Sequence, residues 1–456
     1  MTFKKKTIQT IFRYHKLDLK YMTQQNKIQW RNGFLWLLVL APLFFILYGW
    51  ANGYAALLPK ESVGEIVYNW EKYIPFLPST ILPYWSIDLL YGLSLFLPMT
   101  KFAQRQHALR LLVATPVAVL FFCSFPLTFS TPKPECFGIW KSLFDALMGF
   151  DKPFNQSPSL HIILLVILWR IYLPHFNKTG KVLWNVWCFL IGISVLTTFQ
   201  HHFIDIPAGF LTGLIICYLF PLSKVHCWKW GKIKSKRLAL IYSTAGVLFF
   251  ILAFLFPIAI ALIFIWIGVS LLVIGLGYFG LGAVIFQKKE NGSFTFAANI
   301  LFFPYRWMSR LVRNVFFKSY QSPQKITNKL YLGAFWMTKV HNYHAVFDVC
   351  SEYKKLSHNT QNYISYPLID LATPTIDELH LGVKKLDELM QNNKTVFIHC
   401  ALGMSRSATL VFAWLLYTHK VKSVEEGFAF FEDNNYQFNL SGNHKELLEI
   451  YCKNRN

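Results

Sequence analysis

The stretch 395-TVFIHCALGMSRSATLVFAWLLY-417 decides the fold of the last third of the chain. Residues 396–399 begin with three apolar side chains, which predicts a buried strand. A short loop follows, and 407–417 has the composition and length of a helix. Such a strand–loop–helix turn directs backbone N–H groups and the positive end of the helix at the same place, which suits a bound phosphate.

Cys400 opens this loop and is the candidate nucleophile. The positive end of a helix lowers a thiol pKa, so we expect a thiolate at neutral pH. Arg406 can hold two phosphate oxygens at once, Gly403 allows close approach of the backbone, and Ser407 can donate to the departing sulfur. The predicted phosphate-binding residues are Ala401, Leu402, Gly403, Met404, Ser405 and Ser407, beside Arg406.

The spacing from Cys400 to Arg406 fits C-x5-R, and 399–407 resembles the HCxxGxSRS form of dual-specificity protein phosphatases. The resemblance covers about 326–451 and implies an α/β domain that forms a phosphocysteine, which water then hydrolyses. The family's general acid is an aspartate well before the cysteine, and Asp370 matches it; it would protonate the leaving oxygen and then activate water. Asp377 is the alternative, although we expect it to cap the helix that starts near it.

The substrate of this site is less specified by the sequence. Phosphatases of polyphosphorylated inositides often place lysines inside the loop, and here the loop has none. A highly charged head group is therefore not expected, and a phosphomonoester on a lipid or on a protein remains open. A membrane tether favours lipid.

The composition of the whole chain points to a membrane. Of its 456 residues, 54% are hydrophobic and 15% are charged, which is too apolar for an ordinary soluble protein. The net charge of +22 lies beside apolar runs, so cytoplasmic loops and anionic lipid explain it better than nucleic acid does. The 8 cysteines show no metal-ligand spacing, and we expect no disulfide framework, metal or cofactor.

Apolar runs predict about eight transmembrane helices. They lie at 33–50, 79–97, 109–127, 160–173, 182–198, 206–222, 238–256 and 258–286. Pro257 predicts a tight turn between the last two helices, with a single kinked helix as the alternative. Lys and Arg concentrate in 1–32, 100–110, 174–181 and 223–237, which places these segments and both termini in the cytoplasm.

The chain divides by composition into successive segments. These are a basic tail at 1–32, a transmembrane domain at 33–222, two additional helices at 223–286, a basic linker at 287–324 and a soluble α/β domain at 325–456. The linker alternates arginines with aromatic residues, so it is either an amphipathic segment on anionic lipid or a stiff spacer. In the last segment we expect strands near 329–332, 345–350, 363–367 and 395–399, with helices at 376–391 and 407–417.

Two polar strings interrupt the apolar runs. Pro158-Ser159-Leu160-His161 opens the fourth run, and Ser194 to Asp205 joins the fifth and sixth. Histidine and aspartate are costly in a membrane and mark candidate sites. The predicted topology puts His161 and His201 at the same outer face, and Asp205 can orient the His201 imidazole.

These strings resemble the motifs PSGH and SR-x5-H-x3-D of the type 2 phosphatidic acid phosphatase (PAP2) superfamily. The resemblance implies a six-helix core in which His201 is the nucleophile that forms phosphohistidine and His161 is the acid. His202 lacks the spacing to Asp205 and is expected to be only a neighbour.

The sequence also departs from the PAP2 pattern. Leu160 replaces a glycine, Val195 replaces the phosphate-binding arginine, and the motif K-x6-RP is not found. These departures look more like the branch that includes inositol phosphorylceramide synthases, which transfer a head group to a lipid alcohol. Phosphatase and phosphotransferase chemistry therefore both remain open. The candidates for phosphate contacts are Lys133, Lys141 and Lys152.

Together the patterns predict a bifunctional enzyme of a bacterial inner membrane. An outward-facing PAP2-like site would act on phospholipid or sphingolipid phosphate esters, and a cytosolic site would hydrolyse a phosphomonoester. The alternatives are a membrane-anchored phosphatase of phosphoproteins, with the helical part as anchor and sensor, and a helical part that only binds lipid phosphate and regulates the domain behind it. We expect no nucleic-acid partner.

Overall fold

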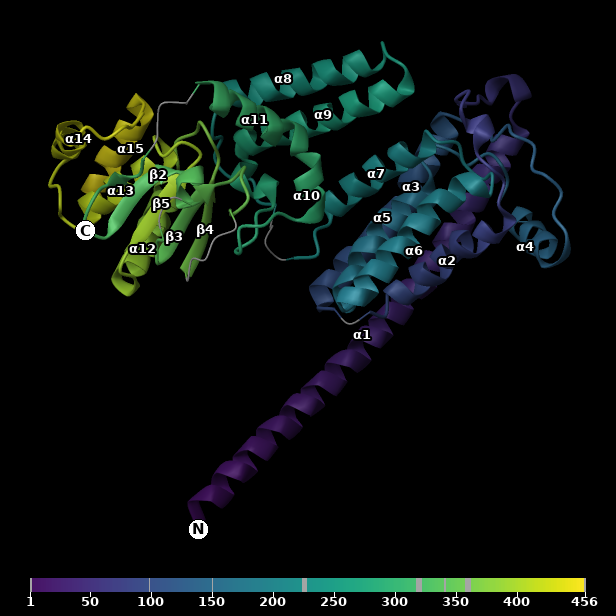
Figure 1. The fold of residues 1–456 in the computed structure, drawn as a ribbon, viewed down its shortest axis with the longest axis horizontal. Coiled ribbons are helices and arrows are strands. Elements are labelled where there is room, and N and C mark those ends of the chain that lie inside the picture. Colours follow the sequence, from purple (N-terminus) through teal and green to yellow (C-terminus); the bar gives the residue numbers. More distant parts are fainter. Residues whose placement is uncertain are drawn as a thin grey trace. The chain divides into compact units, whose positions relative to one another are not determined.

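The computed structural model describes residues 2–97, 99–149, 151–223, 228–316, 322–339, 342–356 and 362–454. It divides into two compact units, Met1–Lys224 and Val225–Asn456, whose elements are labelled in Figure 1.

The first unit is built from helices packed in pairs. The α-helices are α1 (Thr2–Leu57), α2 (Ile81–Ser94), α3 (Lys101–Ser124), α4 (Gly138–Met148), α5 (Leu160–Tyr172), α6 (Lys178–Thr197) and α7 (Asp205–Leu219). Helix α5 packs on α7 and α3, while α2 packs on α6. A Cβ at Gly209 of α7 would lie 2.7 Å from the Ser159 carbonyl oxygen, so α5 and α7 approach backbone to backbone. This crossing brings the first turns of α5 and α7 together.

The second unit begins with an apolar hairpin. Helices α8 (Lys236–Ala253) and α9 (Ile258–Leu276) pack along their length, and Pro257 is the N-cap residue of α9. The predicted turn at Pro257 is therefore confirmed. Helix α9 continues into a π-helical turn, η5 (Gly277–Leu281), and a 3-10 turn, η6 (Gly282–Phe286).

Two helices, α10 (Phe296–Leu301) and α11 (Phe303–Phe316), follow the hairpin. Phe303, Trp307 and Leu311 recur every four residues along α11 and are exposed. On its other side, the Arg313 guanidinium lies 5.1 Å from the centre of the Trp336 ring. Helix α11, which lies within the predicted linker, is therefore amphipathic, and its contact with lipid stays a prediction.

A five-stranded sheet follows in the order β1-β2-β5-β3-β4. The strands are β1 (Gln324–Lys325), β2 (Leu330–Ala334), β3 (Ala345–Cys350), β4 (Asn362–Leu368) and β5 (Val396–Cys400). All pairs are parallel except β1 with β2. The remaining helices are α12 (Ile376–Asn392), α13 (Arg406–Tyr417), α14 (Val424–Asp433) and α15 (Gly442–Lys453), with the 3-10 turn η7 (Phe335–Lys339) after β2. The strands and helices predicted in this segment are confirmed.

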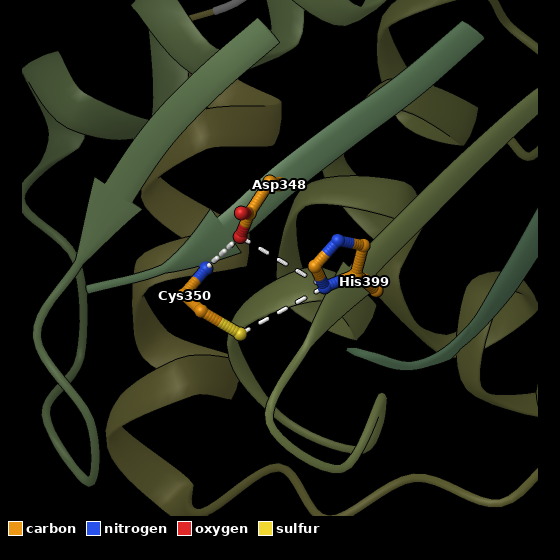
Figure 2. Close-up of side chains that lie close together, drawn as sticks. All are labelled: Asp348, Cys350 and His399. Carbon is orange, nitrogen blue, oxygen red and sulfur yellow. Dashed lines mark hydrogen bonds and ion pairs between the residues drawn. The ribbon is translucent and has the colours of Figure 1, made fainter. Parts of the chain in front are cut away.

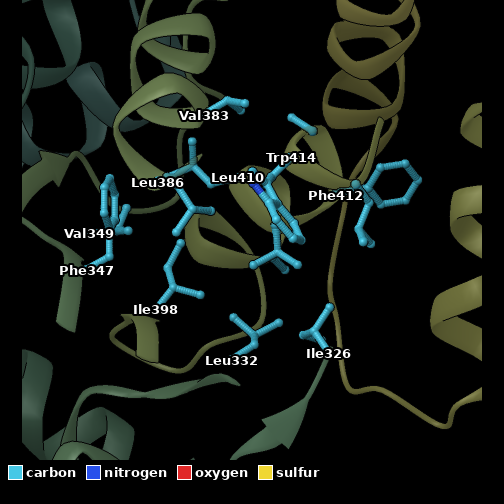
Figure 3. Packing of buried hydrophobic residues seen from close by; sticks show 14 of the residues in the cluster. Ile326, Leu332, Phe347, Val349, Val383, Leu386, Ile398, Leu410, Phe412 and Trp414 are labelled. Atoms are coloured by element: carbon cyan, nitrogen blue, oxygen red, sulfur yellow. The ribbon is translucent and has the colours of Figure 1, made fainter. Parts of the chain in front are cut away.

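The core lies on both faces of the central strand β5. Ile398 packs against Leu386 of α12 and Leu410 of α13 in one buried cluster (Figure 3). The next residue along the strand, Phe397, belongs to a second cluster with Met337 on the opposite face. All five residues of β5 are buried, which explains why its sequence reads as a continuous apolar run.

Five helices of the described chain are long and apolar enough to cross a membrane: Gln29–Leu57, Lys101–Ser124, Lys178–Thr197, Lys236–Ala253 and Ile258–Phe286. Two others, Leu160–His175 and Asp205–Leu219, are apolar but shorter, and α2 has 14 residues. Each predicted apolar run overlaps a helix, so an apolar, helical N-terminal region is confirmed. The count of eight crossings and their orientation stay predictions.

Candidate active site

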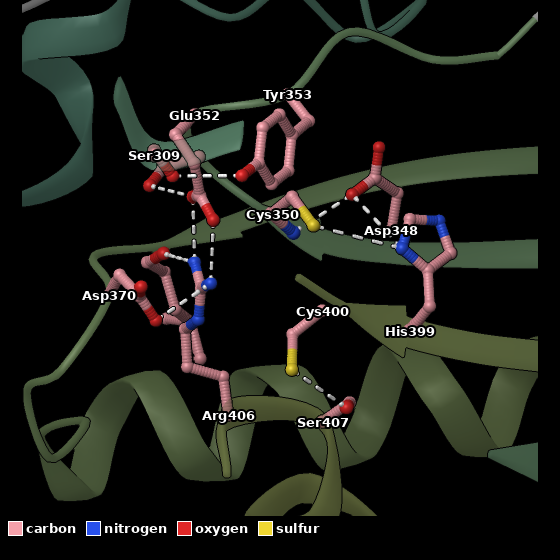
Figure 4. A network of polar contacts seen from close by, with 12 residues as sticks. Ser309, Asp348, Cys350, Glu352, Tyr353, Asp370, His399, Cys400, Arg406 and Ser407 are labelled. Atoms are coloured by element: carbon pink, nitrogen blue, oxygen red, sulfur yellow. Dashed lines mark hydrogen bonds and ion pairs between the residues drawn. The ribbon is translucent and has the colours of Figure 1, made fainter. Parts of the chain in front are cut away.

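The predicted phosphate-binding loop connects the end of β5 at Cys400 to the start of α13 at Arg406 (Figure 4). The Cys400 Sγ accepts hydrogen bonds from the Gly403 N–H and the Ser407 hydroxyl, each at 3.2 Å. Donors aimed at the sulfur, together with the N-terminus of α13, stabilise negative charge on it. The loop therefore presents Cys400 as a nucleophile.

Backbone conformation and close packing against β2 explain why residue 403 of this loop is a glycine. Gly403 has φ +80°, and a Cβ there would lie 2.5 Å from the carbonyl carbon of Gly333 in β2. Only glycine combines that conformation with so close an approach.

Two other predicted loop residues contact the segment before α15 and the first turn of α15. The Met404 carbonyl oxygen accepts from the Asn439 N–H at 2.7 Å, and the Ser405 hydroxyl lies 3.4 Å from His444 Nε2. Ala401 is buried and Leu402 packs against the core. Their side chains are apolar, so these two residues can offer a phosphate only their backbone.

Arg406 is buried, with 1% of its side chain exposed, and is bound by acidic groups. Its two terminal nitrogens donate to the Glu352 carboxylate at 2.7 and 2.8 Å. One of them also lies 2.8 Å from an Asp370 oxygen, and the other donates to the Leu368 carbonyl oxygen at 3.0 Å. These contacts hold the guanidinium beside the loop.

Glu352 was missed by the sequence reasoning. It lies two residues beyond β3, at the same sheet edge where β5 ends. Burial opposes ionisation of Glu352, but the Arg406 guanidinium outweighs burial and lowers the pKa of this carboxyl. The available signal was an acidic residue two positions after a largely apolar strand, since the carboxyl ends of parallel strands meet at one edge.

Asp370 lies in the loop after β4, and 32% of its side chain is exposed. Burial raises the pKa of this carboxyl above its ordinary value, although the Arg406 guanidinium opposes the shift. A carboxyl that keeps its proton to higher pH beside the phosphate-binding arginine has the properties of a general acid. The Tyr278 hydroxyl donates to the Asp370 carbonyl oxygen at 2.9 Å and holds the loop in place.

Asp377, the alternative acid, is exposed in the first turn of α12. The prediction that it caps this helix is wrong, because Thr375 is the N-cap residue. The Thr375 hydroxyl accepts from the Glu378 N–H at 3.2 Å, and the Glu378 carboxylate accepts from the Thr375 N–H at 2.7 Å. This capping box ends the Asp370 loop at a defined place.

Residues 330–453 match the family described as dual specificity phosphatase, catalytic domain. This part of the chain is a dual specificity phosphatase domain. Over 47 residues, the chain is 43% identical to the human protein phosphatidylglycerophosphatase and protein-tyrosine phosphatase 1. That match covers 10% of this chain and 23% of the relative, so less than a quarter of the relative's length is spanned.

Solved structures resemble part of the chain as well. A crystal structure of PTPMT1 is 21% identical, with 29% of this chain and 95% of that chain covered and a TM-score of 0.23. Tk-PTP in its active form is 20% identical, with 29% and 97% covered and a TM-score of 0.26.

A buried polar network lies beside Cys400 in the phosphatase domain. One ligand atom each from Asp348, Cys350 and His399 lies within 4.8 Å of the others, as three ligands of a metal would (Figure 2). However, the Lys288 ammonium already lies 2.7 Å from one Asp348 oxygen, and the Tyr363 hydroxyl donates to that oxygen at 2.5 Å. The other oxygen, Oδ1, accepts from the Cys350 N–H at 2.8 Å. These contacts form a structural network that connects β3 and β5 to Lys288, two residues after η6.

The PAP2-like residues of the first unit also converge. The His201 Nδ1 lies 3.2 Å from the Asp205 carboxylate, and the His161 and His201 ring centres are 6.2 Å apart. The His161 Nε2 is buried and has no hydrogen-bond partner among the described residues. The His202 Nδ1 lies 3.0 Å from the Glu71 carboxylate instead, while the backbone N–H of His202 donates to the Asp205 carboxylate at 3.1 Å.

An acidic residue that the sequence reasoning did not single out, Asp151, lies near this pair. It accepts from the Tyr48 hydroxyl at 2.7 Å and from the Tyr84 hydroxyl at 3.3 Å. The Tyr84 ring stacks on His161, with ring centres 3.9 Å apart. Tyr48 and Tyr84 come from separate helices, so no local sequence pattern predicts that both contact Asp151.

Lys133, Lys141 and Lys152 line an open pocket of about 730 Å³, together with Asp151. Neither His161 nor His201 lines it. Lys141 is paired with Asp145 at 2.8 Å, and Val195 is fully buried in an apolar cluster. The structure thus brings the histidines and Asp205 together and leaves the lysines in a neighbouring pocket.

Proposed function

We propose that the chain is a membrane-bound phosphatase that hydrolyses a phosphomonoester through a phosphocysteine on Cys400. The observation that carries this proposal is that the Cys400 Sγ accepts hydrogen bonds from the Gly403 N–H and the Ser407 hydroxyl at the start of α13. The first residue of that helix, Arg406, is paired with Asp370. Nucleophile, phosphate-binding group and acid thus come from one connected set of contacts.

The reaction follows from these groups. The Cys400 thiolate attacks phosphorus, the bond to the leaving oxygen breaks, and that oxygen takes the Asp370 proton. Water then attacks the phosphocysteine, Asp370 accepts a proton from it, and the thiolate departs with the Ser407 hydroxyl as donor. A substrate phosphate competes with the Asp370 carboxylate for Arg406, which frees Asp370 to carry the proton.

A phospholipid is the substrate class that we favour. The phosphatase domain shares its compact unit with α8 and α9, both apolar and long enough to cross a membrane. The human relative is named as a phosphatidylglycerophosphatase. The phosphate-binding loop has no lysine for additional phosphates, so a head group with a single phosphomonoester fits best.

The test is hydrolysis of a substrate panel by the purified full chain and by Cys400→Ser. The panel contains phosphatidylglycerophosphate, phosphatidylinositol phosphate, phosphatidate, a sphingolipid phosphate and phosphopeptides. We expect the highest kcat/KM on a lipid monoester, with loss of that activity in Cys400→Ser. Faster hydrolysis of phosphopeptides would favour the protein phosphatase alternative, which the second half of the relative's name also supports.

A second activity is proposed for the first unit, carried by the His201–Asp205 contact and the unpartnered His161 Nε2. His201 would attack the phosphorus of a lipid phosphate ester, and His161 would protonate the leaving alcohol; water or a lipid alcohol would then accept the phosphoryl or head group. The absence of a matching arginine, with buried Val195 in its place, leaves phosphate binding to other groups.

The background for testing this site is Cys400→Ser, in which the first activity is removed. Adding His201→Ala should abolish the residual turnover of lipid phosphate esters, whereas His175→Ala, an exposed histidine in the 3-10 turn Leu173–His175, should not. Absence of residual turnover on every lipid tested would reduce the first unit to an anchor or a regulator.

A further inference from the structure

An open pocket of about 880 Å³ lies within the second unit, and Cys400 is not among the residues that line it. Its walls are the segment 229–234, the residues after α9 from Leu281 to Glu290, and the start of α12. Five lysines line it against three carboxylates; the lysines are Lys229, Lys232, Lys234, Lys288 and Lys289, and the acids are Glu290, Asp377 and Glu378.

Two of these lysines are already neutralised. Lys234 lies 2.5 Å from Glu378, and Lys288 lies 2.7 Å from Asp348. Lys229, Lys232 and Lys289 have no acidic partner among the residues that the structure describes. The pocket therefore offers three free ammonium groups to an anion.

The surroundings of the pocket indicate where that anion comes from. The apolar hairpin α8–α9 starts two residues after Lys234 and ends at the pocket wall, so a membrane that holds the hairpin lies next to the pocket. Trp228 and Trp230 flank Lys229 and are exposed, at 37% and 63%. Exposed tryptophans beside lysines at the end of an apolar helix are typical of the head-group layer.

The pocket wall is also connected to the catalytic acid. The Gly231 N–H donates to the Gly280 carbonyl oxygen at 3.0 Å, and the Lys234 N–H donates to the Tyr278 carbonyl oxygen at 2.9 Å. The hydroxyl of the same Tyr278 holds the Asp370 carbonyl oxygen. The lysine segment, the turn η5 and the acid loop thus form one continuous chain of hydrogen bonds.

We infer that this pocket binds the phosphate of an anionic phospholipid that is not hydrolysed, and that the bound head group positions Asp370 through Tyr278. Lys229, Lys232 and Lys289 contact the phosphate. The consequence is a phosphatase that works faster on an anionic bilayer than on a neutral one, whatever lipid it hydrolyses.

The activity test uses the full chain in phosphatidylcholine vesicles with and without phosphatidylglycerol, and phenyl phosphate as a soluble substrate. We expect phosphatidylglycerol to raise the rate by about fivefold or more, the lower end of coupling between two sites. The double variant K229Q/K232Q should lose this rate increase. The control K420Q/K445Q removes the same charge from exposed positions outside the pocket and should keep the increase. An equal ratio in all three proteins, or no rise in the wild type, overturns the inference.

A binding test separates this inference from the proposed function. Phosphatidylglycerol in neutral detergent micelles is titrated into Cys400→Ser, with and without K229Q/K232Q, and heat is measured. Weaker binding in the triple variant supports the site even if the wild type hydrolyses no substrate. Equal binding with and without the lysines overturns it, as does inorganic phosphate binding as tightly as the lipid, since the ligand would then be a free anion.

Discussion

The Arg406 side chain joins three parts of the sheet edge: the loop after β5, Glu352 after β3 and Asp370 after β4. The arginine and Glu352 are each 1% exposed, so neither charge is compensated by water. Breaking such a pair leaves a buried charge, which is costly. The same pair orients the guanidinium before a phosphate arrives.

Replacement of Glu352 by glutamine tests this pair. We expect Glu352→Gln to lower the free energy of unfolding by up to about 3 kcal/mol, the lower end for a broken buried pair, and to lower kcat. The loss should shrink in acid, because the lowered pKa of Glu352 makes its contribution disappear as pH falls below the ordinary glutamate range. Thermal unfolding in detergent measures this, with the exposed Glu446→Gln as control; an unchanged melting temperature would contradict it.

The protonation state of Asp370 predicts how kcat depends on pH on the alkaline side of its maximum. A general acid must carry its proton, so kcat falls as pH rises through the pKa of Asp370, which burial has raised. The falling limb should therefore lie above the range of an ordinary aspartate. Asp370→Asn should remove the limb and slow hydrolysis of a lipid ester by about 10²–10⁴-fold. A variant with the wild-type profile would assign the acid role elsewhere.

Gly403 allows a matched comparison of two glycines. At Gly403 an added Cβ meets β2 and the backbone has φ +80°, whereas at Gly442 nothing lies within 4 Å. Gly403→Ala should abolish activity and destabilise the domain by more than about 1–2 kcal/mol, the cost of a left-handed backbone alone. Gly442→Ala should leave activity and melting temperature almost unchanged.

At the scale of elements, the parallel sheet explains why distant residues meet. Strands β3, β4 and β5 run in the same direction, so the residues after Cys350, Leu368 and Cys400 emerge at one edge. The π-helical turn η5, which continues α9, reaches the same edge, because its Tyr278 hydroxyl donates to the Asp370 carbonyl oxygen. An apolar helix thus contributes a hydroxyl to the acid loop.

This contact makes Tyr278 a positioning residue with a specific signature. Tyr278→Phe removes the donor to the Asp370 carbonyl oxygen but keeps the ring, which stacks on Tyr242 with centres 5.5 Å apart. We expect a rate loss of about fivefold for phenyl phosphate, from one lost hydrogen bond, and a much smaller loss for p-nitrophenyl phosphate, whose leaving group needs less acid assistance. Equal losses on both substrates would indicate a purely structural role; Tyr417→Phe, at an exposed position, is the control.

At the scale of the whole molecule, the topology predicted from loop charge can be tested with natural cysteines. Cys136 lies between the predicted apolar runs 109–127 and 160–173, a connection that the predicted topology places outside. Cys452 lies in the phosphatase domain, and both cysteines are partly exposed. In intact cells an impermeant maleimide should label Cys136, and Cys452 should react only after permeabilisation. Variants that lack each cysteine identify the signals. Equal labelling of both before permeabilisation would contradict the predicted orientation.

The sequence predicted the parts of each site that are local along the chain. The turn from Val396 to Tyr417 places Cys400, Gly403, Arg406 and Ser407 within one strand, loop and helix, so composition and spacing were sufficient. His201 and Asp205 are likewise four residues apart. The error over Asp377 was also local: Thr375 with Glu378 makes a capping box, and this signal was overlooked.

Contacts between distant segments depended on the tertiary structure. Glu352 is 54 residues from Arg406, and Tyr278 is 92 residues from Asp370. The hydrogen-bond partner of such a side chain is set by which distant segment the fold places next to it. The periodicity of apolar residues along the chain does not predict that segment. The sequence by itself determined the apolar helices, the phosphatase loop and its nucleophile; packing of parallel strands and of the hairpin decided which carboxylate holds the arginine and which hydroxyl holds the acid loop.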